Sequence, residues 1–516
     1  MSGGEIVRLP PSNREQKLFV DNGKRLFYLL GVPSLSILLL GMGSFLVANP
    51  SFFFLIPFAG LTSIYLIISY FVGAFSKSFE FKTHEAIVGN GGLTRLSESQ
   101  VTVDIYHCIC GEDLEIIEAA IDAIAVACAS SPYKTKYFIL CDSKDNAHYS
   151  RVSQMAQEHQ ITVIRRANLG EMKKAGNLRY AFTKTNGQFI VIFDADFRPR
   201  HDFMIHTIPY FIDDHRLAIL QTPQYFNLDE QYTWISKGAA FIQELFYRMI
   251  NVNRETFGAA ICVGTNAVYR RSALEPFGGT AAVDYSEDVR TGFKCLAAGW
   301  RIKYIPVVLA SGENPDTIDA YVSQQHRWAM GSISLMTVRE FWDAPITTMQ
   351  RLCYLSGMFY YITTGIGIFL GYIPAILMLA FYPEKMVWFA FFFSLPSMIF
   401  GMAFMAWWSR FKWGTYSIKC RTLSYYAHFL AMWEKVTGSI TPWTPSGAAA
   451  KTKIHHRFYS LLTVNTVLPT LAIFFLFGLR FDHHPVENML PSVIVYSFYT
   501  YFNFSILFDI RRSLDR

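Results

Sequence analysis

Six apolar stretches, each long enough to cross a lipid bilayer, constrain this chain more than any other feature of its sequence. They cover residues 26–46, 52–75, 351–381, 386–408, 459–479 and 489–509. A hydrocarbon core of about 30 Å needs roughly 20 apolar residues in a helix, so each stretch is long enough. Glycines and Pro374 interrupt the third stretch, which predicts a tilt, a kink or a break there.

The composition agrees with a membrane domain joined to a polar domain. Hydrophobic residues make up 52% of the 516 residues and charged residues only 17%, whereas soluble domains carry about 25% charged residues. These values exclude a purely soluble protein and a disordered chain. The polar middle third argues against a transporter that lies wholly in the membrane. The net charge of +6 is too small to indicate a nucleic-acid partner and fits Lys and Arg placed beside spans.

Positive charge predicts the orientation of the spans. The segments 1–25 and 409–458 and the C-terminal tail are rich in Lys and Arg, whereas the turns near 382–385 and 480–488 carry little positive charge. Because basic loops stay on the cytoplasmic side, we expect a multi-pass protein of the plasma (inner) membrane with both termini and the 77–345 block in the cytosol. We expect no cleaved signal peptide, since no small-residue cleavage site follows the first apolar run.

The 77–345 block alternates short β-branched runs with helical patterns. Strand-like runs cover 101–106, 137–141, 161–164 and 189–193. This alternation predicts a mostly parallel, doubly wound α/β sheet. Ligands of such sheets bind beyond the carboxyl ends of the strands, and aspartates follow two of the predicted strands.

The first of these carboxylates is Asp142, and the second group is the pair Asp194 and Asp196. Such a pair can place one carboxylate on a sugar hydroxyl and the other on Mg²⁺ or Mn²⁺, which prefer oxygen ligands. A polar turn is the alternative interpretation of the pair. Lys174 precedes a predicted helix and could neutralise a phosphate, although alone it would be only a solvated lysine.

Two further clusters contain residues suited to catalysis or to substrate binding. The run 286–288 precedes an amphipathic helix, where Asp288 could take a proton from a hydroxyl as a general base; an N-terminal capping box is the alternative. On a helix, Gln324 and Arg327 are i,i+3 neighbours that can face one diphosphate, while Trp328 can stack on a sugar ring. Anchoring at the membrane interface is the alternative for the Arg-Trp pair, and His326 is expected to be structural.

The joint order of these clusters resembles the processive family-2 glycosyltransferases, the group of cellulose synthase and relatives that make chitin, hyaluronan and other β-linked polymers. The matching residues, in chain order, are Asp142, Asp194, Asp196, Asp288, Gln324, Arg327 and Trp328. The resemblance covers about 77–345 by motif and 346–516 by architecture. The Gln-x-x-Arg-Trp signature is typical of polymer-making members rather than of single-sugar relatives.

The resemblance implies an α/β GT-A glycosyltransferase domain inserted in an α-helical transmembrane domain of about six spans. It also implies amphipathic interface helices, which match residues 229–254, 317–340 and 416–437. The expected segments are a cytosolic N-terminal tail (1–25), transmembrane helices 1–2 (26–76), the cytosolic GT-A domain (77–345), transmembrane helices 3–4 (346–410), an interface helix with a gating loop (411–458), and transmembrane helices 5–6 with a short tail (459–516).

The resemblance also implies roles for individual residues. The implied donor-binding residues are Glu112, Asp142, Lys174, Asp194, Gln324 and Arg327, with Asp196 as ligand of a Mg²⁺ or Mn²⁺ cofactor. Asp288 is the implied catalytic base, and the implied acceptor site holds Gly264, Thr265, Glu287 and Trp328. Trp443 and Thr444 lie where relatives carry a gating loop over the nucleotide; a plain linker is the alternative there.

Two departures from the family pattern leave the sugar open. The run 107–112 lacks the aromatic residue that frames the uracil in relatives, so that Glu112 alone matches. Val263, Gly264 and Thr265 stand where cellulose synthases have Cys-Gly-Ser near the acceptor. We also expect no cyclic-di-GMP switch, since no regulatory domain follows the last span in this sequence.

These features predict a processive, inverting glycosyltransferase that polymerises a UDP-sugar, with UDP-glucose as first choice, into a β-linked polysaccharide and exports it through its own channel. Alternatives are a UDP-N-acetylglucosamine-using synthase of the chitin or hyaluronan kind, and a non-processive transferase onto a lipid carrier. A transporter would need ionisable residues inside its spans, and this chain has almost none. The expected partners are the UDP-sugar, the growing polysaccharide and the bilayer, but no nucleic acid. An accessory export subunit and a homo-oligomer stay open.

Overall fold

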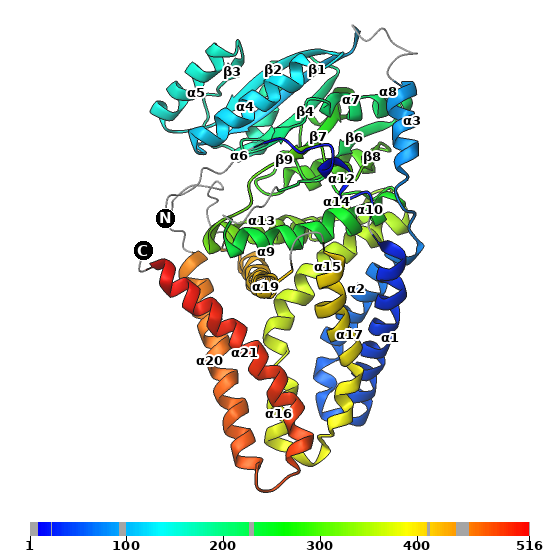
Figure 1. Cartoon of the computed structure of the whole chain (residues 1–516), viewed down its shortest axis with the longest axis vertical. Helices are drawn as coiled ribbons and strands as arrows, with labels where there is room; N and C mark the ends of the chain where they lie inside the picture. The colour runs from blue at the N-terminus through cyan, green and yellow to red at the C-terminus, as the bar shows by residue number, and fades with distance from the viewer. Residues whose placement is uncertain are drawn as a thin grey trace.

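The computed structural model of the chain describes residues 9–21, 23–91, 100–226, 232–409, 413–439 and 454–514. Figure 1 shows an α/β layer at one end of the molecule, long helices at the other end and further helices lying across the junction between them. The segment that carries the predicted gating-loop residues Trp443 and Thr444 lies outside the described residues.

A seven-stranded sheet forms the centre of the α/β layer. Its strands are β1 (Thr102–Ile109), β2 (Lys134–Cys141), β3 (Thr162–Ile164), β4 (Phe189–Asp194), β6 (Leu217–Gln221), β7 (Ala267–Arg270) and β8 (Arg301–Tyr304). They lie in the order β3-β2-β1-β4-β7-β6-β8. Four of the six strand pairs are parallel, and only β7 runs antiparallel to its two neighbours. The predicted mostly parallel α/β sheet is therefore confirmed.

Helices cover both faces of this sheet. They include α4 (Leu114–Ala129), α5 (Asn146–Glu158), α6 (Lys173–Phe182), α7 (Phe203–Thr207), α8 (Pro209–Asp213), α11 (Arg271–Leu274) and α12 (Glu287–Ala297). Asp113 and Asp145 begin α4 and α5, because their carboxylates accept hydrogen bonds from backbone N–H groups of the first turn. Apolar side chains of the helices and strands are buried between them, which stabilises the layer.

The register of the strands brings the predicted site residues to one edge. Cys108 of β1 lies opposite Asp194 of β4, and Ile109 of β1 lies opposite Cys141 of β2. Asp142 and Asp194 therefore emerge at the same carboxyl end of the sheet. A short antiparallel ribbon of β5 (Arg198–Pro199) and β9 (Ala310–Ser311) closes one side of this edge.

Five helices of the described part of the chain are long and apolar enough to cross a membrane. They comprise α1 (Lys24–Ala48), α2 (Ile56–Phe75) with the preceding turn Pro50–Leu55, α15 (Thr348–Leu370) continuing into α16 (Ile373–Phe381), α20 (Ile454–Arg480) and α21 (Val486–Leu514). The break between α15 and α16 falls at Gly371 and Tyr372, just before Pro374, as the glycine and proline pattern predicts.

The predicted span 386–408 forms a shorter apolar helix, Leu395–Trp408. It consists of α17 (Leu395–Ile399), a π-helical turn (Phe400–Phe404) and α18 (Met405–Trp408), and a 3-10 turn over Trp388–Phe393 precedes it. Pro396 lies in the first turn of α17 and cannot donate a backbone hydrogen bond, which explains why the helix begins there rather than at 386. Figure 1 shows α17 beside α1.

Helices at the junction match the three segments predicted as interface helices. They are α9 (Trp234–Leu245), α10 (Asn251–Glu255), α13 (Ile318–Met336), α14 (Arg339–Asp343) and α19 (Thr415–Thr437). Figure 1 shows α9 and α13 crossing the molecule between the sheet and the membrane helices. Ile235, Tyr321 and Cys420 of α9, α13 and α19 share one buried cluster, so the three helices form a single layer.

The N-terminal segment is built into the α/β layer. Residues 9–21, which we call the N-terminal strap, cross the layer before α1 begins. The side chain of Phe19 is only 1% exposed, and the N–H of Val308 donates to the carbonyl of Gln16 over 3.0 Å. Helix α3 (Phe81–Gly91) follows α2 in the chain and packs on α7 and α8.

All eight cysteines are free thiols, and six of them are buried. The two others, Cys110 and Cys128, are half-buried. Burial raises the pKa of both thiols to about 12. The cysteines therefore act as small apolar side chains.

Candidate functional site

Asp142 follows β2 and is held by an arginine that the sequence analysis did not identify. Nε and Nη2 of Arg166 each donate to one carboxylate oxygen of Asp142 over 2.7 Å, and the N–H of Gly170 donates over 3.2 Å. Both side chains are almost completely buried. This bidentate pair connects β2 to the loop that leads into α6. Nucleotide contact by Asp142 stays a prediction, because Arg166 occupies both oxygens.

Lys174 joins two parts of the predicted site. It lies in the first turn of α6, and its Nζ donates to Oδ1 of Asp194 and, over 2.8 Å, to the carbonyl of Gly264. Burial alone would lower the pKa of Lys174, but the adjacent carboxylate of Asp194 raises it above its usual range. The lysine therefore stays charged beside the position expected for phosphates.

Thr265 and Gln221 fix the loop that contacts Lys174. The N–H of Asp194 donates to Oγ1 of Thr265 over 2.9 Å. The side chain of Gln221 donates to the carbonyl of Thr265 over 2.7 Å and accepts from the N–H of Val263 over 2.9 Å. The Gly264 loop is thus fixed to β4 and to the end of β6.

Asp196 lies beside Asp194 at the same strand end. Its Oδ2 accepts a hydrogen bond from the N–H of Glu313 over 2.8 Å. Burial, and then the negative charge of Asp194, raise the pKa of Asp196 to about 7. Arg198 forms a buried ion pair with Glu313 over 2.9 Å. The two neighbouring carboxylates therefore form a site whose negative charge a cation would compensate.

The residues fit a divalent cation that is shared with a substrate. Among the described residues, no group of three or more His, Cys, Asp or Glu side chains could hold a metal by itself. Mg²⁺ commonly takes one or two carboxylates and completes its shell with water and substrate phosphates. Asp196, with Asp194 beside it, matches that donor set.

Asp288 lies in the first turn of α12, on the other side of Gly264. Burial, and then the charge of Glu287, raise the pKa of Asp288 to about 7. Its Oδ1 accepts from the N–H of Val289 over 2.8 Å. Ser286 has a left-handed backbone (φ 48°), and its side chain accepts no capping hydrogen bond from the N–H of any described residue. The capping-box alternative is therefore wrong, and the role of Asp288 as a general base stays a prediction.

The residues of the Gln-x-x-Arg-Trp signature lie on α13. Burial lowers the pKa of Arg327 to about 10, whereas the nearby charge of Asp194 favours its charged form. The buried Oε1 of Gln324 accepts no hydrogen bond from any described residue. A buried acceptor without a protein partner can accept a hydrogen bond from a bound ligand. Trp328 is half-buried beside them.

His326 has the structural role that the sequence predicts. Its Nε2 lies 3.2 Å from Oε2 of Glu434 on α19, and both side chains are almost completely buried. This contact joins the helix of Arg327 to the junction layer. Gly331, one turn later, lies against Ser286, since a Cβ at this glycine would be 1.9 Å from the serine Oγ. The first turn of α12 and the signature helix α13 are thus in direct contact.

Glu112 lies in the loop between β1 and α4. Its Oε2 accepts a hydrogen bond from the N–H of Cys110 over 2.6 Å, and burial raises the pKa of Glu112 to about 7. The buried ring of His107 connects β1 to the aspartate pair, because its Nε2 is 3.2 Å from the carbonyl of Ala195. Glu112 therefore lies at the same edge of the sheet as Asp142 and Asp194.

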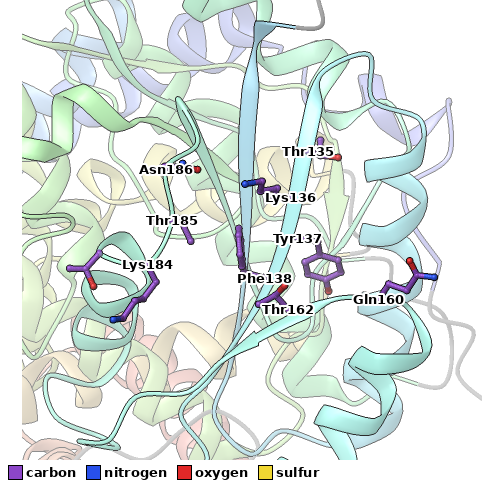
Figure 2. Close-up of a pocket in the computed structure, with 10 residues that line it drawn as sticks. Thr135, Lys136, Tyr137, Phe138, Gln160, Thr162, Lys184, Thr185 and Asn186 are labelled. Carbon is purple, nitrogen blue, oxygen red and sulfur yellow. The ribbon is translucent and has the colours of Figure 1, made fainter.

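A separate pocket of about 660 Å³ lies at the opposite ends of these strands. Figure 2 shows its lining, which comes from β2, β3 and the loop before β4. The lining residues are Thr135, Lys136, Tyr137, Phe138, Gln160, Thr162, Thr183, Lys184, Thr185 and Asn186. It contains no predicted site residue, so it is distinct from the carboxyl-end site.

Comparison with known proteins agrees with this geometry. Residues 108–331 match the model of the family described as "Glycosyltransferase like family 2". Cellulose synthase 1 of Komagataeibacter xylinus is 30% identical over 266 residues, which cover 50% of this chain and 16% of that protein. The UDP-forming cellulose synthase catalytic subunit of Xanthomonas axonopodis pv. citri (strain 306) is 28% identical over 273 residues, which cover 50% of this chain and 35% of the subunit.

The chain thus aligns with about a third or less of the length of these relatives. Among solved structures, the mannosyltransferase PcManGT from Pyrobaculum calidifontis, in complex with GDP-Man and Mn²⁺, superposes with a TM-score of 0.48 at 14% identity. That match covers 74% of this chain and 100% of the mannosyltransferase.

The matched segment 108–331 contains the whole sheet edge described above, from Glu112 to Trp328. The resemblance inferred from the sequence is confirmed by this match. Residues 108–331 are therefore similar to the family-2 glycosyltransferases, and helices long and apolar enough to cross a membrane lie on both sides of this segment.

Proposed function

We propose that this protein is a processive, inverting glycosyltransferase that extends a β-linked polysaccharide from a UDP-sugar. One observation carries the proposal. Lys174 contacts both Asp194 and the carbonyl of Gly264, and Gly264 in turn lies against Asp288. A cation suited to phosphate and a carboxylate suited to proton removal therefore meet at one loop, as a displacement at a sugar carbon requires.

The mechanism follows from the charges of these groups. Asp288 accepts the proton of the acceptor hydroxyl as its oxygen bonds to the anomeric carbon of the donor and the bond from that carbon to the diphosphate breaks. Its pKa of about 7 suits a general base near neutral pH. Lys174 and Arg327 stabilise the negative charge that develops on the departing diphosphate. A single displacement of this kind inverts an α-linked donor into a β-linked product.

Asp196 and Asp194 would hold a Mg²⁺ or Mn²⁺ ion together with the donor phosphates. Such an ion supplies charge neutralisation to the leaving diphosphate. The hydrogen bond from the N–H of Glu313 to Oδ2 of Asp196 leaves Oδ1 of this carboxylate for the cation. Gln324, with its unsatisfied Oε1, contributes a further polar contact to the bound donor.

The surroundings of Trp328 support an acceptor chain that continues toward the membrane helices. Residues just after it on α13, including Ala329 and Ile333, pack with Tyr361 of α15 and with α19. The rings of Tyr361 and His428 are 4.8 Å apart, and Thr364 bonds the same histidine over 2.8 Å. Aromatic faces and neutral polar groups bind sugar rings without a charge preference, which suits export of a neutral glucan.

UDP-glucose is the proposed donor, because relatives that match this chain are UDP-forming cellulose synthase subunits. UDP-N-acetylglucosamine is the alternative. The test is incubation of the purified protein in lipid vesicles with Mg²⁺ or Mn²⁺ and each radiolabelled UDP-sugar, alone and in pairs. We expect polymer of high molecular weight from one donor, and linkage-specific hydrolases then identify it. Release of UDP without polymer would contradict processive synthesis.

A further inference from the structure

The N-terminal strap makes several specific hydrogen bonds with the β5–β9 ribbon and with Arg200, the residue that follows β5. Oγ of Ser311 donates to the carbonyl of Leu9 over 2.7 Å. Arg200, which follows β5, donates to the carbonyl of Pro11 over 2.7 Å and to Oδ1 of Asn13 over 2.8 Å. Ser311 belongs to β9 and Arg200 adjoins β5, so the strap holds both halves of the ribbon.

Glu15 forms the central contact of the strap. Its Oε1 accepts a hydrogen bond from the hydroxyl of Tyr225 over 2.7 Å, while Oε2 accepts from the N–H and Oγ of Ser12 over 2.8 and 2.7 Å. The ring of Phe19 packs edge-on against the ring of Tyr225, with centroids 6.1 Å apart. The position of Tyr225 therefore depends on two side chains of the strap.

A short series of backbone contacts leads from Tyr225 to the predicted metal ligand. Tyr225 pairs with Ser311 in a parallel β-bridge, and the N–H of Gly312 donates to the carbonyl of Tyr225 over 2.9 Å. The next residue, Glu313, donates its N–H to Oδ2 of Asp196. Gly312 cannot shift freely, because the ring of Phe197 lies 2.6 Å from where its Cβ would be.

We propose that the N-terminal strap, through Glu15 and Tyr225, positions the segment Ser311–Glu313 and thereby sets the orientation of Asp196 toward its divalent cation. The inference rests on the proposed function, in which Asp196 binds the metal. Outer groups that orient a metal-binding carboxylate typically change metal affinity by about 10- to 100-fold when they are lost. Glu15 and Tyr225 are positioning residues, since neither contacts Asp196.

The strap also connects this site to the membrane domain. Nε of Arg248 donates to the carbonyl of Asp21 over 3.0 Å, near the point where α1 begins at Lys24. The strap is therefore the part of the chain that leads from the ribbon beside Asp196 to the first membrane helix.

The test measures Mn²⁺ binding to the full-length protein in lipid nanodiscs with UDP, by electron paramagnetic resonance of free Mn²⁺. Tyr225→Phe removes one hydroxyl, and we expect the Mn²⁺ dissociation constant to rise about tenfold. Lys17→Gln is the matched control, because the contacts it breaks are with α3 and not with Tyr225 or the ribbon: an exposed ion pair with Glu85 over 3.9 Å and a cation–π contact with the ring of Phe81, 4.2 Å from its centroid. We expect the control to bind Mn²⁺ like the wild type.

A double-mutant cycle separates positioning from general stability. If Glu15 acts through Tyr225, the variant with both Glu15→Ala and Tyr225→Phe binds Mn²⁺ no more weakly than Tyr225→Phe alone. Wild-type Mn²⁺ affinity in Tyr225→Phe, or additive losses in the double variant, would overturn the inference. Asp196→Ala separates a failure of this inference from a failure of the proposed function. If Asp196→Ala also kept the wild-type Mn²⁺ affinity, the assignment of Asp196 as metal ligand would itself be wrong.

Discussion

Gly264 lies directly against Asp288, so that a Cβ on the glycine would come within 2.9 Å of the aspartate Cβ. The glycine has a φ of +80°, a conformation that costs other residues about 1 kcal/mol or more. Its carbonyl accepts the hydrogen bond of Lys174. One residue thus contacts both the predicted base and the predicted phosphate-binding lysine.

The first prediction tests this contact. Gly264→Ala should lower kcat at least about tenfold, because the added methyl group displaces Asp288 from its working geometry and a displacement of about 1 Å can cost 100-fold in rate. Gly299→Ala is the matched control: its φ is +86°, but nothing lies within 4 Å of its Cβ position. We expect this control to lose some stability and little activity. Equal kcat losses in both variants would indicate backbone strain alone.

The second prediction concerns the base. Asp288→Asn should abolish polymer formation, since an amide cannot accept the acceptor proton, while UDP binding measured by calorimetry survives. Glu275→Gln, an exposed carboxylate at the start of a 3-10 turn of the same domain, serves as the control and should leave synthesis unchanged. Polymer synthesis near the wild-type rate in Asp288→Asn would remove Asp288 as the base.

The third prediction is a pH dependence. Burial and Glu287 raise the pKa of Asp288 to about 7 in the free protein. Only the ionised carboxylate accepts a proton, so kcat/KM should fall as the pH drops below about 7 and level off above it. Initial rates of UDP release across this range give the profile. A rate that stays constant down to about pH 5 would contradict a base with a raised pKa.

The fourth prediction addresses the pair Asp142 and Arg166. Arg166→Met leaves a buried carboxylate without its partner, which typically costs about 3–5 kcal/mol. Unfolding followed by intrinsic fluorescence should therefore show a clear loss of stability. Arg301→Met, which breaks an ion pair with the less buried Asp214, should cost about 1 kcal/mol or less. Adding Asp142→Leu to Arg166→Met should restore part of the lost stability, and no recovery would contradict this explanation.

The fifth prediction concerns Trp328. Trp328→Ala should reduce chain elongation more than hydrolysis of the donor, because stacking on a sugar ring holds the acceptor and not the UDP-sugar. Polymer length and UDP release are measured on the same samples. Trp407→Ala is the control, since this residue is 69% exposed on α18 and distant in sequence from the site. Equal losses of elongation and hydrolysis would argue against a stacking role.

Local patterns in the sequence predict most of the sheet and its carboxyl-end residues. Asp142 follows a strand, Asp194 is the last residue of a strand, and Asp288 lies in the first turn of a helix; a strand end fixes which edge of the sheet a residue reaches. Arg327 is predicted for a similar reason, because its spacing from Gln324 determines the face of a helix that both share.

Long-range contacts could not be predicted from these patterns. The partner of Asp142 is 24 residues away, and nothing in the run around Arg166 distinguishes it from a surface arginine. The sequence predicts only a cytosolic N-terminal tail over 1–25. The contacts that hold the strap to Tyr225 and Ser311 join residues about 200 to 300 positions apart, and no local pattern reports them. The start of α17 at Leu395 depends on Pro396, and a π-helical turn follows α17; apolar length alone predicts neither feature.

The burial of the cysteines has a practical consequence for labelling. Thiol-reactive probes attack the thiolate, and burial keeps the pKa of Cys110, Cys262 and Cys295 at about 12, far above neutral pH. A single cysteine introduced at an exposed position, such as Lys17 on the strap or Lys184 beside the pocket of Figure 2, would therefore be the fastest thiol to react. Site-specific fluorophores or spin labels can thus be attached without first removing the native cysteines.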